Sequence, residues 1–211
     1  MTCAICKTHP KYSDKDSYCR TCNSLRTIRK QHLFKYAQLE YFAEREKTDI
    51  GTCLTCRGVF HPSQLGIHTP AGIPYQKASH STGSVPFKEE FLNYLDMRDL
   101  CCLNCIRAHR GTGCSELKQR ALDFLGGSCS SCGFDGPPAA LEFHHTDRSI
   151  KKLQIGDKGL KHWAEISIEL EGCEILCANC HALEHFMEKQ ALRDDWIKTY
   201  NLDEDHYIIY K

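Results

Sequence analysis

The amino-acid sequence predicts a small α+β protein in which zinc ions, rather than one large hydrophobic core, hold short elements together. Twelve of the fifteen cysteines fall into six Cys-x-x-Cys pairs, and the segments between the pairs alternate between helical and β-prone patterns. Such regular pairing is typical of zinc sites and rare in disulfide scaffolds. We therefore expect three structural Zn²⁺ sites and an intracellular, reducing compartment such as the cytoplasm.

Composition and charge restrict the classes of partner that the protein is expected to bind. Lys and Arg together number 27, and so do Asp and Glu, so bulk charge does not attract nucleic acid and any such contact must come from local basic clusters. No apolar run approaches the ~18 residues of a membrane span. The N-terminal segment MTCAICKTHP lacks the apolar core of a secretory signal. We expect no membrane partner.

Residues 1–50 form the first predicted domain, a zinc module followed by a helix. Few apolar residues lie between its two cysteine pairs, so metal binding has to supply most of its folding free energy (Cys3, Cys6, Cys19, Cys22). The helix is predicted over 23–47, with an apolar stripe on one side (Leu25, Ile28, Leu33, Tyr36, Leu39, Phe42). Its basic residues Arg26, Arg29 and Lys30 are either a contact to a DNA backbone or an ordinary solvated face, and the pattern favours neither.

Residues 51–113 form the second predicted domain, which holds another four-cysteine site (Cys53, Cys56, Cys102, Cys105). Cys101 competes with Cys102, but only Cys102 has the required spacing. The segment 61–85 is rich in Pro, Gly, Ser and His and predicts a loop. Residues 86–98 predict a helix with aromatic and apolar residues on one side (Phe87, Phe91, Tyr94, Leu95).

Residues 114–211 form the third predicted domain. A short helix is expected over 114–127, ended by two glycines, and another over 161–170 with an inward apolar face (Trp163, Ile166, Leu170). The third four-cysteine site belongs to this domain (Cys129, Cys132, Cys177, Cys180). Four thiolates close a tetrahedral zinc site and leave no position for a substrate, so this metal is expected to be scaffolding.

Four histidines beside the third cysteine site suit a different, open metal. His181 and His185 are four residues apart in a helix-compatible segment, which places them on one face. Together with His144 they offer three neutral imidazoles, which can hold a divalent ion and leave positions for water and phosphate. His145 follows directly, so on a strand it points to the opposite face. An ordinary histidine pKa near ~6.5 suits proton abstraction from water.

This pattern resembles the HNH endonuclease family, whose ββα-metal motif is a two-stranded hairpin followed by a helix. The variant most similar to this chain carries a His-His pair, two zinc knuckles and a CxxCHxxxH ending, and the resemblance covers about 128–189. It implies a DNA endonuclease that hydrolyses phosphodiester bonds and leaves 5′-phosphate and 3′-hydroxyl ends. An origin in a phage or a mobile element fits such an enzyme.

The resemblance also implies roles for individual residues. His145 would be the general base, and His144, His181 and His185 would bind one catalytic divalent ion, either Mg²⁺, Mn²⁺, Ni²⁺ or Zn²⁺. The family's middle Asn is absent, because its place falls at Gly172 or Cys173. In the family this Asn holds the backbone of the loop before the second knuckle. Its absence therefore affects how that loop is supported more than it affects the catalytic chemistry.

The expected partner is DNA. The segment 148–161 is the most one-sidedly basic part of the chain, and its attachment to the predicted hairpin favours phosphate contact over plain solvation (Arg148, Lys151, Lys152, Lys158, Lys161). The alternative function is a non-catalytic, zinc-dependent DNA-binding protein with a structural histidine cluster, against which the spacing of four histidines argues. A zinc deaminase is poorly supported because no knuckle follows a Pro. Three cysteines outside the pairs are interpreted as buried free thiols rather than nucleophiles (Cys101, Cys114, Cys173).

The second and third domains are alike in spacing. Each begins with a Cys-x-x-Cys pair closely followed by Gly (Gly58, Gly133), each closes with Cys-x-Asn-Cys, and 45 and 44 residues separate their pairs. The tripeptide Ile67-His68-Thr69 falls near His144-His145-Thr146, whereas Ile106 and Arg110 stand where His181 and His185 do. We hypothesise that the second domain is a degenerate copy of the third; independent zinc ribbons with similar spacing are the alternative.

Overall fold

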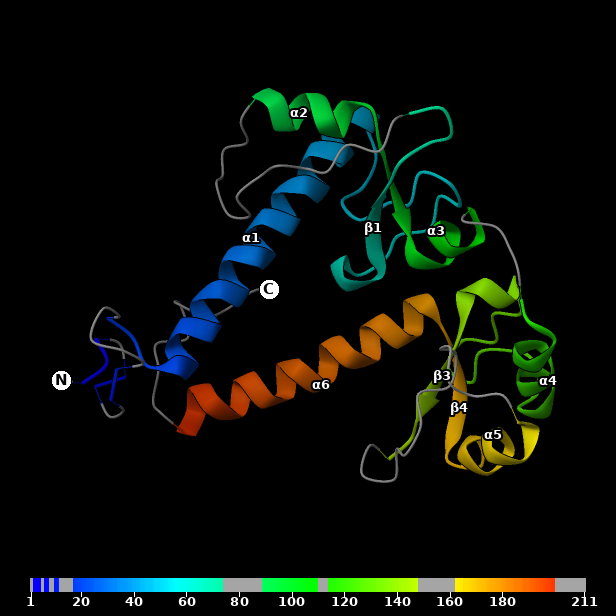
Figure 1. The fold of residues 1–211 in the computed structure, drawn as a ribbon. Coiled ribbons are helices and arrows are strands. Elements are labelled where there is room, and N and C mark those ends of the chain that lie inside the picture. Colours follow the sequence, from blue (N-terminus) through cyan, green and yellow to red (C-terminus); the bar gives the residue numbers. More distant parts are fainter. Residues whose placement is uncertain are drawn as a thin grey trace. The chain divides into compact units, whose positions relative to one another are not determined.

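The computed structural model is a small α+β protein with three cysteine clusters, and it describes residues 2–4, 6–7, 10–11, 17–73, 89–109, 114–147 and 162–199 (Figure 1). The elements follow in the order α1 (Arg20–Glu46), the 3₁₀ turn η1 (Pro62–Gln64), β1 (Leu65–His68), α2 (Glu89–Asp96), β2 (Asp99–Cys102), α3 (Leu103–His109), α4 (Glu116–Phe124), the 3₁₀ turn η2 (Pro138–Ala140), β3 (Leu141–His145), α5 (Trp163–Leu170), β4 (Cys173–Cys177) and α6 (Ala178–Thr199).

The chain divides into two compact units. The first comprises Met1–Ile50, Thr69–Asp99 and Phe186–Lys211, and the second comprises Gly51–His68 and Leu100–His185. Within the described residues, no helix combines the length and apolar character needed to cross a lipid bilayer.

Helix α1 of the first unit begins at a cysteine of the first cluster. Cys19 caps the helix, because its Sγ accepts a hydrogen bond from the Cys22 backbone N–H at 3.5 Å. The helix ends at Lys47, which takes a left-handed conformation with φ of 52°. The predicted apolar stripe is correct for three buried residues (Leu25, Leu39, Phe42). It is wrong for Leu33 and Tyr36, whose side chains are exposed.

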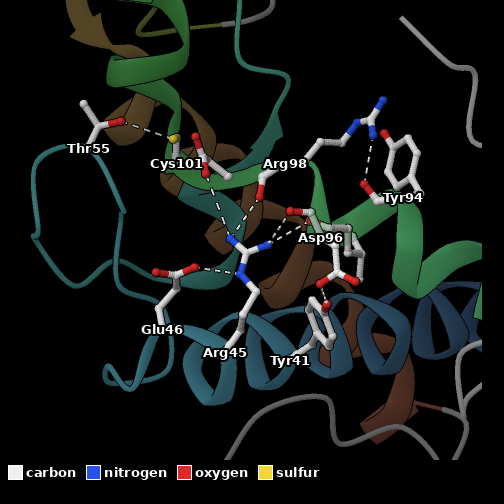
Figure 2. Close-up of polar contacts among 10 residues, drawn as sticks. Tyr41, Arg45, Glu46, Thr55, Tyr94, Asp96, Arg98 and Cys101 are labelled. Carbon is white, nitrogen blue, oxygen red and sulfur yellow. Dashed lines mark hydrogen bonds and ion pairs between the residues drawn. The ribbon is translucent and has the colours of Figure 1, made fainter. Parts of the chain in front are cut away.

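Helix α2 packs against the C-terminal part of α1 within the first unit. The Arg45 guanidinium donates to the carbonyl oxygens of Leu95 at 2.9 Å and Arg98 at 3.0 Å (Figure 2). The Tyr41 hydroxyl donates to the Asp96 carboxylate. Burial of Tyr41, together with this carboxylate, raises the pKa of its hydroxyl to about 12. The helix predicted over 86–98 is observed over Glu89–Asp96, and residues 86–88 lie outside the described residues.

The second unit contains two two-stranded sheets, β1–β2 and β3–β4, and each leads directly into a helix (Figure 1). Strands β3 and β4 are antiparallel, with Leu141 opposite Cys177 and His145 opposite Cys173. Helices α4 and α5 cover this hairpin with buried apolar residues (Ala121, Leu122, Ile166, Leu170). This packing fixes the strand that carries the His-His pair.

Helix α4 shows how local sequence sets the boundaries of an element. Ser115 caps its start by accepting a hydrogen bond from the Lys118 N–H at 3.2 Å. Gly126 and Gly127, with φ of 95° and 74°, follow its end. Ala121 and Leu122 of this helix are buried, whereas the apolar side chain of Phe124 is exposed. Of the three cysteines outside the pairs, Cys101 and Cys173 are buried, whereas Cys114 is only half-buried (all three reduced).

Candidate metal centre

Each of the three predicted four-cysteine sets comes together in space. Within each set all the ligand atoms lie within 4.8 Å of one another. Sulfur atoms bound to one tetrahedral zinc at ~2.3 Å are about 3.8 Å apart. The Sγ atoms of Cys6 and Cys19, and those of Cys132 and Cys177, are 3.8 Å apart. The three clusters are therefore compatible with structural zinc sites.

The backbone around the second and third clusters is arranged to stabilise a thiolate. Burial of the Cys129 thiol opposes ionisation, but backbone N–H groups of Cys177, Cys132 and Ser131 lower its pKa to about 7. The Cys53 thiol has the same environment, since N–H groups of its own knuckle and of Cys102 lower its pKa to about 7 despite burial. The surrounding backbone therefore favours one thiolate, Cys53 or Cys129, in each of these two sets.

A separate group of three histidines lies beside the third cluster. His144 comes from β3, and His181 and His185 come from the first turns of α6. One ring nitrogen from each lies within 4.8 Å of the others. The ring centroids are 5.2 Å apart for His144 and His181, 5.3 Å for His144 and His185, and 4.4 Å for His181 and His185. The residues predicted as ligands of an open site are therefore brought together, and this donor set fits a divalent transition metal.

The cysteine cluster positions these histidines. Cys177 is the last residue of β4 and Cys180 lies in the first turn of α6, so their thiols hold the start of the helix to the hairpin. The Cys180 backbone N–H also donates to Cys177 Sγ at 3.5 Å. A zinc bound here would fix the helix that presents His181 and His185 to β3.

Glu142 orients one candidate ligand, and sequence reasoning missed it. His181 Nδ1 donates to Glu142 Oε2 at 2.5 Å, and Arg107 Nη2 donates to the other carboxylate oxygen at 3.0 Å. The hydrogen bond from His181, and then the charges of His181 and Arg107, lower the pKa of Glu142. This arrangement leaves His181 Nε2 for a metal. A signal was present, because Glu142 and His144 are two residues apart on a strand and share a face.

His145 lies on the opposite face of β3, as the strand alternation predicts. The β3–β4 pairing is regular through His145, which is the last residue of β3, so no bulge redirects its side chain. Its Nε2 donates to Glu169 Oε1 at 2.6 Å, and the two side chains are 9% and 7% exposed. Glu169 belongs to α5, and no spacing in the sequence connects it with His145. The bond to Glu169 engages Nε2 and leaves the other ring nitrogen, Nδ1.

The loop that joins α5 to β4 is tied to the end of β3. The Thr146 backbone N–H and its hydroxyl both donate to the Gly172 carbonyl oxygen, at 3.1 and 3.2 Å. Gly172 is one of the positions where the HNH resemblance would place an Asn. Two hydrogen bonds from Thr146 therefore hold this loop where an Asn side chain was expected to do so.

The basic residues predicted to contact DNA are only partly described. Arg26, Arg29 and Lys30 lie on α1 in the first unit, where Arg26 is half-buried with its guanidinium 4.5 Å from the centroid of the Tyr18 ring. Lys30 is exposed. The five residues of the basic loop lie outside the described residues (Arg148, Lys151, Lys152, Lys158, Lys161).

Comparison of the chain with protein-family models, with curated proteins and with solved structures gives no match in any of the three.

Proposed function

We propose that the chain is a metal-dependent DNA endonuclease of the HNH type. The observation that carries the proposal is that one strand, β3, contributes both to a three-histidine cluster and to a histidine–carboxylate pair. His144 lies with His181 and His185 on one face of β3, and His145 lies with a buried carboxylate on the other. Three imidazoles can bind a metal ion and leave coordination positions open, and a carboxylate orients the neighbouring imidazole. Together these groups can activate water for attack on a phosphodiester.

The metal ligands and the His145–Glu169 pair have different roles in the proposed reaction. A divalent ion bound to the three imidazoles would supply positive charge to the phosphate and to the departing 3′ oxygen. His145 accepts the proton of a water molecule at Nδ1 as the water oxygen bonds to phosphorus and the bond from phosphorus to the 3′ oxygen breaks. Glu169 holds the imidazole by Nε2 and stabilises the imidazolium that forms. His145 is the last residue of β3, so the proposed reaction requires a phosphate that binds at this end of the strand and extends from the metal on one face to His145 on the other.

A second candidate function is non-catalytic DNA binding, which the low exposure of His145 favours. A side chain that is 9% exposed and bonded to a buried glutamate also fits a structural pair. In that case the three-histidine cluster would stabilise the hairpin and helix. The two functions differ in whether removal of one histidine changes DNA cleavage or only folding.

The test is plasmid cleavage by the full chain. Metal-depleted protein, with Zn²⁺ restored to the cysteine sites, is supplied separately with Mg²⁺, Mn²⁺, Ni²⁺ and Zn²⁺ and incubated with supercoiled plasmid. Cleavage that depends on one of these ions and is lost in His181→Ala is expected. The matched control is His162→Ala, since His162 is exposed and its side chain makes no capping hydrogen bond to α5. DNA binding without cleavage under every ion would replace the endonuclease with the second candidate.

A further inference from the structure

Two stretches of the chain, the predicted second and third domains, repeat one order of elements. After the Cys53 and Cys56 knuckle come η1, β1, α2, β2 and α3, and after the Cys129 and Cys132 knuckle come η2, β3, α5, β4 and α6. Equivalent residues of the two stretches are separated by the same number of positions, from the two knuckles to the prolines that open the 3₁₀ turns, Pro62 and Pro138. The hairpin that leads into a helix at Cys105 is the feature that the copy hypothesis requires.

Backbone hydrogen bonds repeat in the same register. Within the knuckles, the N–H of Arg57 donates to the Cys53 carbonyl at 2.9 Å, and the N–H of Gly133 donates to the Cys129 carbonyl at 2.8 Å. Arg57 and Gly133 have positive φ of 62° and 74°. The residue equivalent to Gly133 is therefore Arg57, and Gly58, the glycine that closely follows the knuckle of the second domain, lies one position further along.

The two copies contact each other reciprocally through the Asn of each Cys-x-Asn-Cys. The Asn104 backbone N–H donates to Asn179 Oδ1 at 3.1 Å, and the Asn179 backbone N–H donates to Asn104 Oδ1 at 3.0 Å. Both residues are buried. Likewise η1 reaches α6, since Gln64 Nε2 donates to the Asn179 carbonyl at 3.3 Å, and η2 packs against α3. A contact in which each partner uses the same residue is the signature of a two-fold, isologous interface.

The copies differ at the metal site. His68 ends β1 in the register of His144, so the tripeptide Ile67-His68-Thr69 is equivalent to Phe143-His144-His145. In place of His181 the first copy has Ile106, and in place of Glu142 it has Gly66. A Cβ added at Gly66 would lie only 2.7 Å from Ile106 Cδ1, so this position has no room for a side chain unless Ile106 moves. Thr69 takes the position of His145. The ring of His68 stacks on that of His109, 4.8 Å between centroids. The first copy therefore keeps one imidazole of the ligand set and has lost its carboxylate and its base.

We infer that the first copy takes the place of a partner subunit in an isologous dimer, so that one chain holds both strands of a duplex and cuts only one. This inference rests on the proposed endonuclease function. The strands of duplex DNA are related by two-fold axes, and two-fold proteins present equivalent surfaces to them. In this chain only one of the two surfaces carries His144, His181, His185 and His145. The substrate is duplex DNA and the product is a single-strand nick.

The test follows both strands of supercoiled plasmid, at chain concentrations where sedimentation shows a single chain. Nicked circles should accumulate until the supercoiled form is consumed, before linear DNA appears, and sequencing of the ends should show one strand cut at each site. His68→Ala should leave this nicking unchanged, since His68 belongs to the copy without a complete ligand set. His145→Ala should abolish it.

Two results overturn the inference while leaving the endonuclease in place. One is linear DNA formed without a nicked intermediate, with both strands cut at comparable rates. The other is loss of cutting of one strand in His68→Ala, which would make the first copy catalytic. The absence of cleavage with every ion is a different result, because it removes the endonuclease function itself and the inference with it.

Discussion

At the residue scale, the candidate site depends on carboxylates that hold imidazoles. Glu142 connects Arg107 of the first copy to His181 of the second, and Glu169 holds His145. Partners of this kind fix the tautomer and the orientation of a ligand and tune its basicity. In each case the carboxylate occupies one ring nitrogen and so decides which nitrogen remains for metal or proton.

Glu142→Gln should weaken metal binding at the histidine site by about 10–100-fold, the usual cost of losing such a partner. Arg107→Ala should have a smaller effect, at most about fivefold, because the Arg107 side chain is 45% exposed and exposed ion pairs contribute up to about 1 kcal/mol. Calorimetric titration with Ni²⁺, with the cysteine sites filled by Zn²⁺, measures both. Glu165→Gln, an exposed residue of α5, is the control. Equal affinities in all four proteins would show that Glu142 does not orient the ligand.

The histidines could be found from sequence, whereas Glu169 could not, for a physical reason. His181 and His185 share a helix face by spacing alone, and His144 and His145 split to opposite faces by strand alternation. Glu169 meets His145 only because α5 packs on the hairpin. That is a tertiary contact between residues 24 positions apart. Glu142 was predictable in principle, since it shares the face of His144, but a strand glutamate is usually a surface residue.

At the element scale, the knuckles show how one turn tolerates two residue types. Gly133 takes φ of 74° without penalty, whereas Arg57 takes φ of 62° in the equivalent position and bears the steric cost of the left-handed region. A Cβ at Gly133 would meet no atom within 4 Å. The cost of a side chain there is therefore one of backbone conformation alone.

Gly133→Ala should lower the free energy of unfolding of the zinc-loaded protein by about 1 kcal/mol, and Arg57→Gly should raise it by a similar or smaller amount. Thermal unfolding at fixed Zn²⁺ concentration measures both substitutions. Opposite signs are expected because the two positions are equivalent in the copies. A gain of stability in both variants would show that the turns do not correspond.

Helices and cysteine clusters were predicted more accurately than the exposed faces. The clusters follow from spacing, because zinc demands four thiolates in one place. Helix α4 follows from a Ser cap and a pair of glycines. The stripe on α1 failed at Leu33 and Tyr36 because periodicity marks an apolar face along a helix of 27 residues, whereas tertiary partners decide how much of it is covered. The register of the two copies follows from the constant spacing of the knuckles and prolines, and the backbone φ values and hydrogen bonds of the two turns agree with it.

At the scale of the whole molecule, two classes of metal should coexist. Binding free energy at an all-cysteine site is largely folding free energy, roughly 10–16 kcal/mol per site, while an ion on three imidazoles has open positions and leaves more easily.

Stepwise chelation separates the two classes. Elemental analysis of purified protein should give close to three zinc ions per chain, as expected for the three cysteine clusters. Mild chelation should remove the histidine-held ion first, and cleavage with it, while helical circular dichroism is unchanged. Stronger chelation should then unfold the chain. A count near one zinc per chain would exclude two of the three cysteine sites.

The assignment of His145 is tested most directly by single-turnover cleavage with His145→Ala. If His145 is the general base, cleavage should fall by roughly 10²–10⁴-fold, the usual contribution of such a group. Ni²⁺ affinity and zinc content should stay at wild-type values, because His145 contributes to neither cluster. DNA affinity should also be nearly unchanged. Cleavage within about tenfold of wild type, with the metals in place, would show that His145 is not the general base, since such a group contributes at least ~10²-fold.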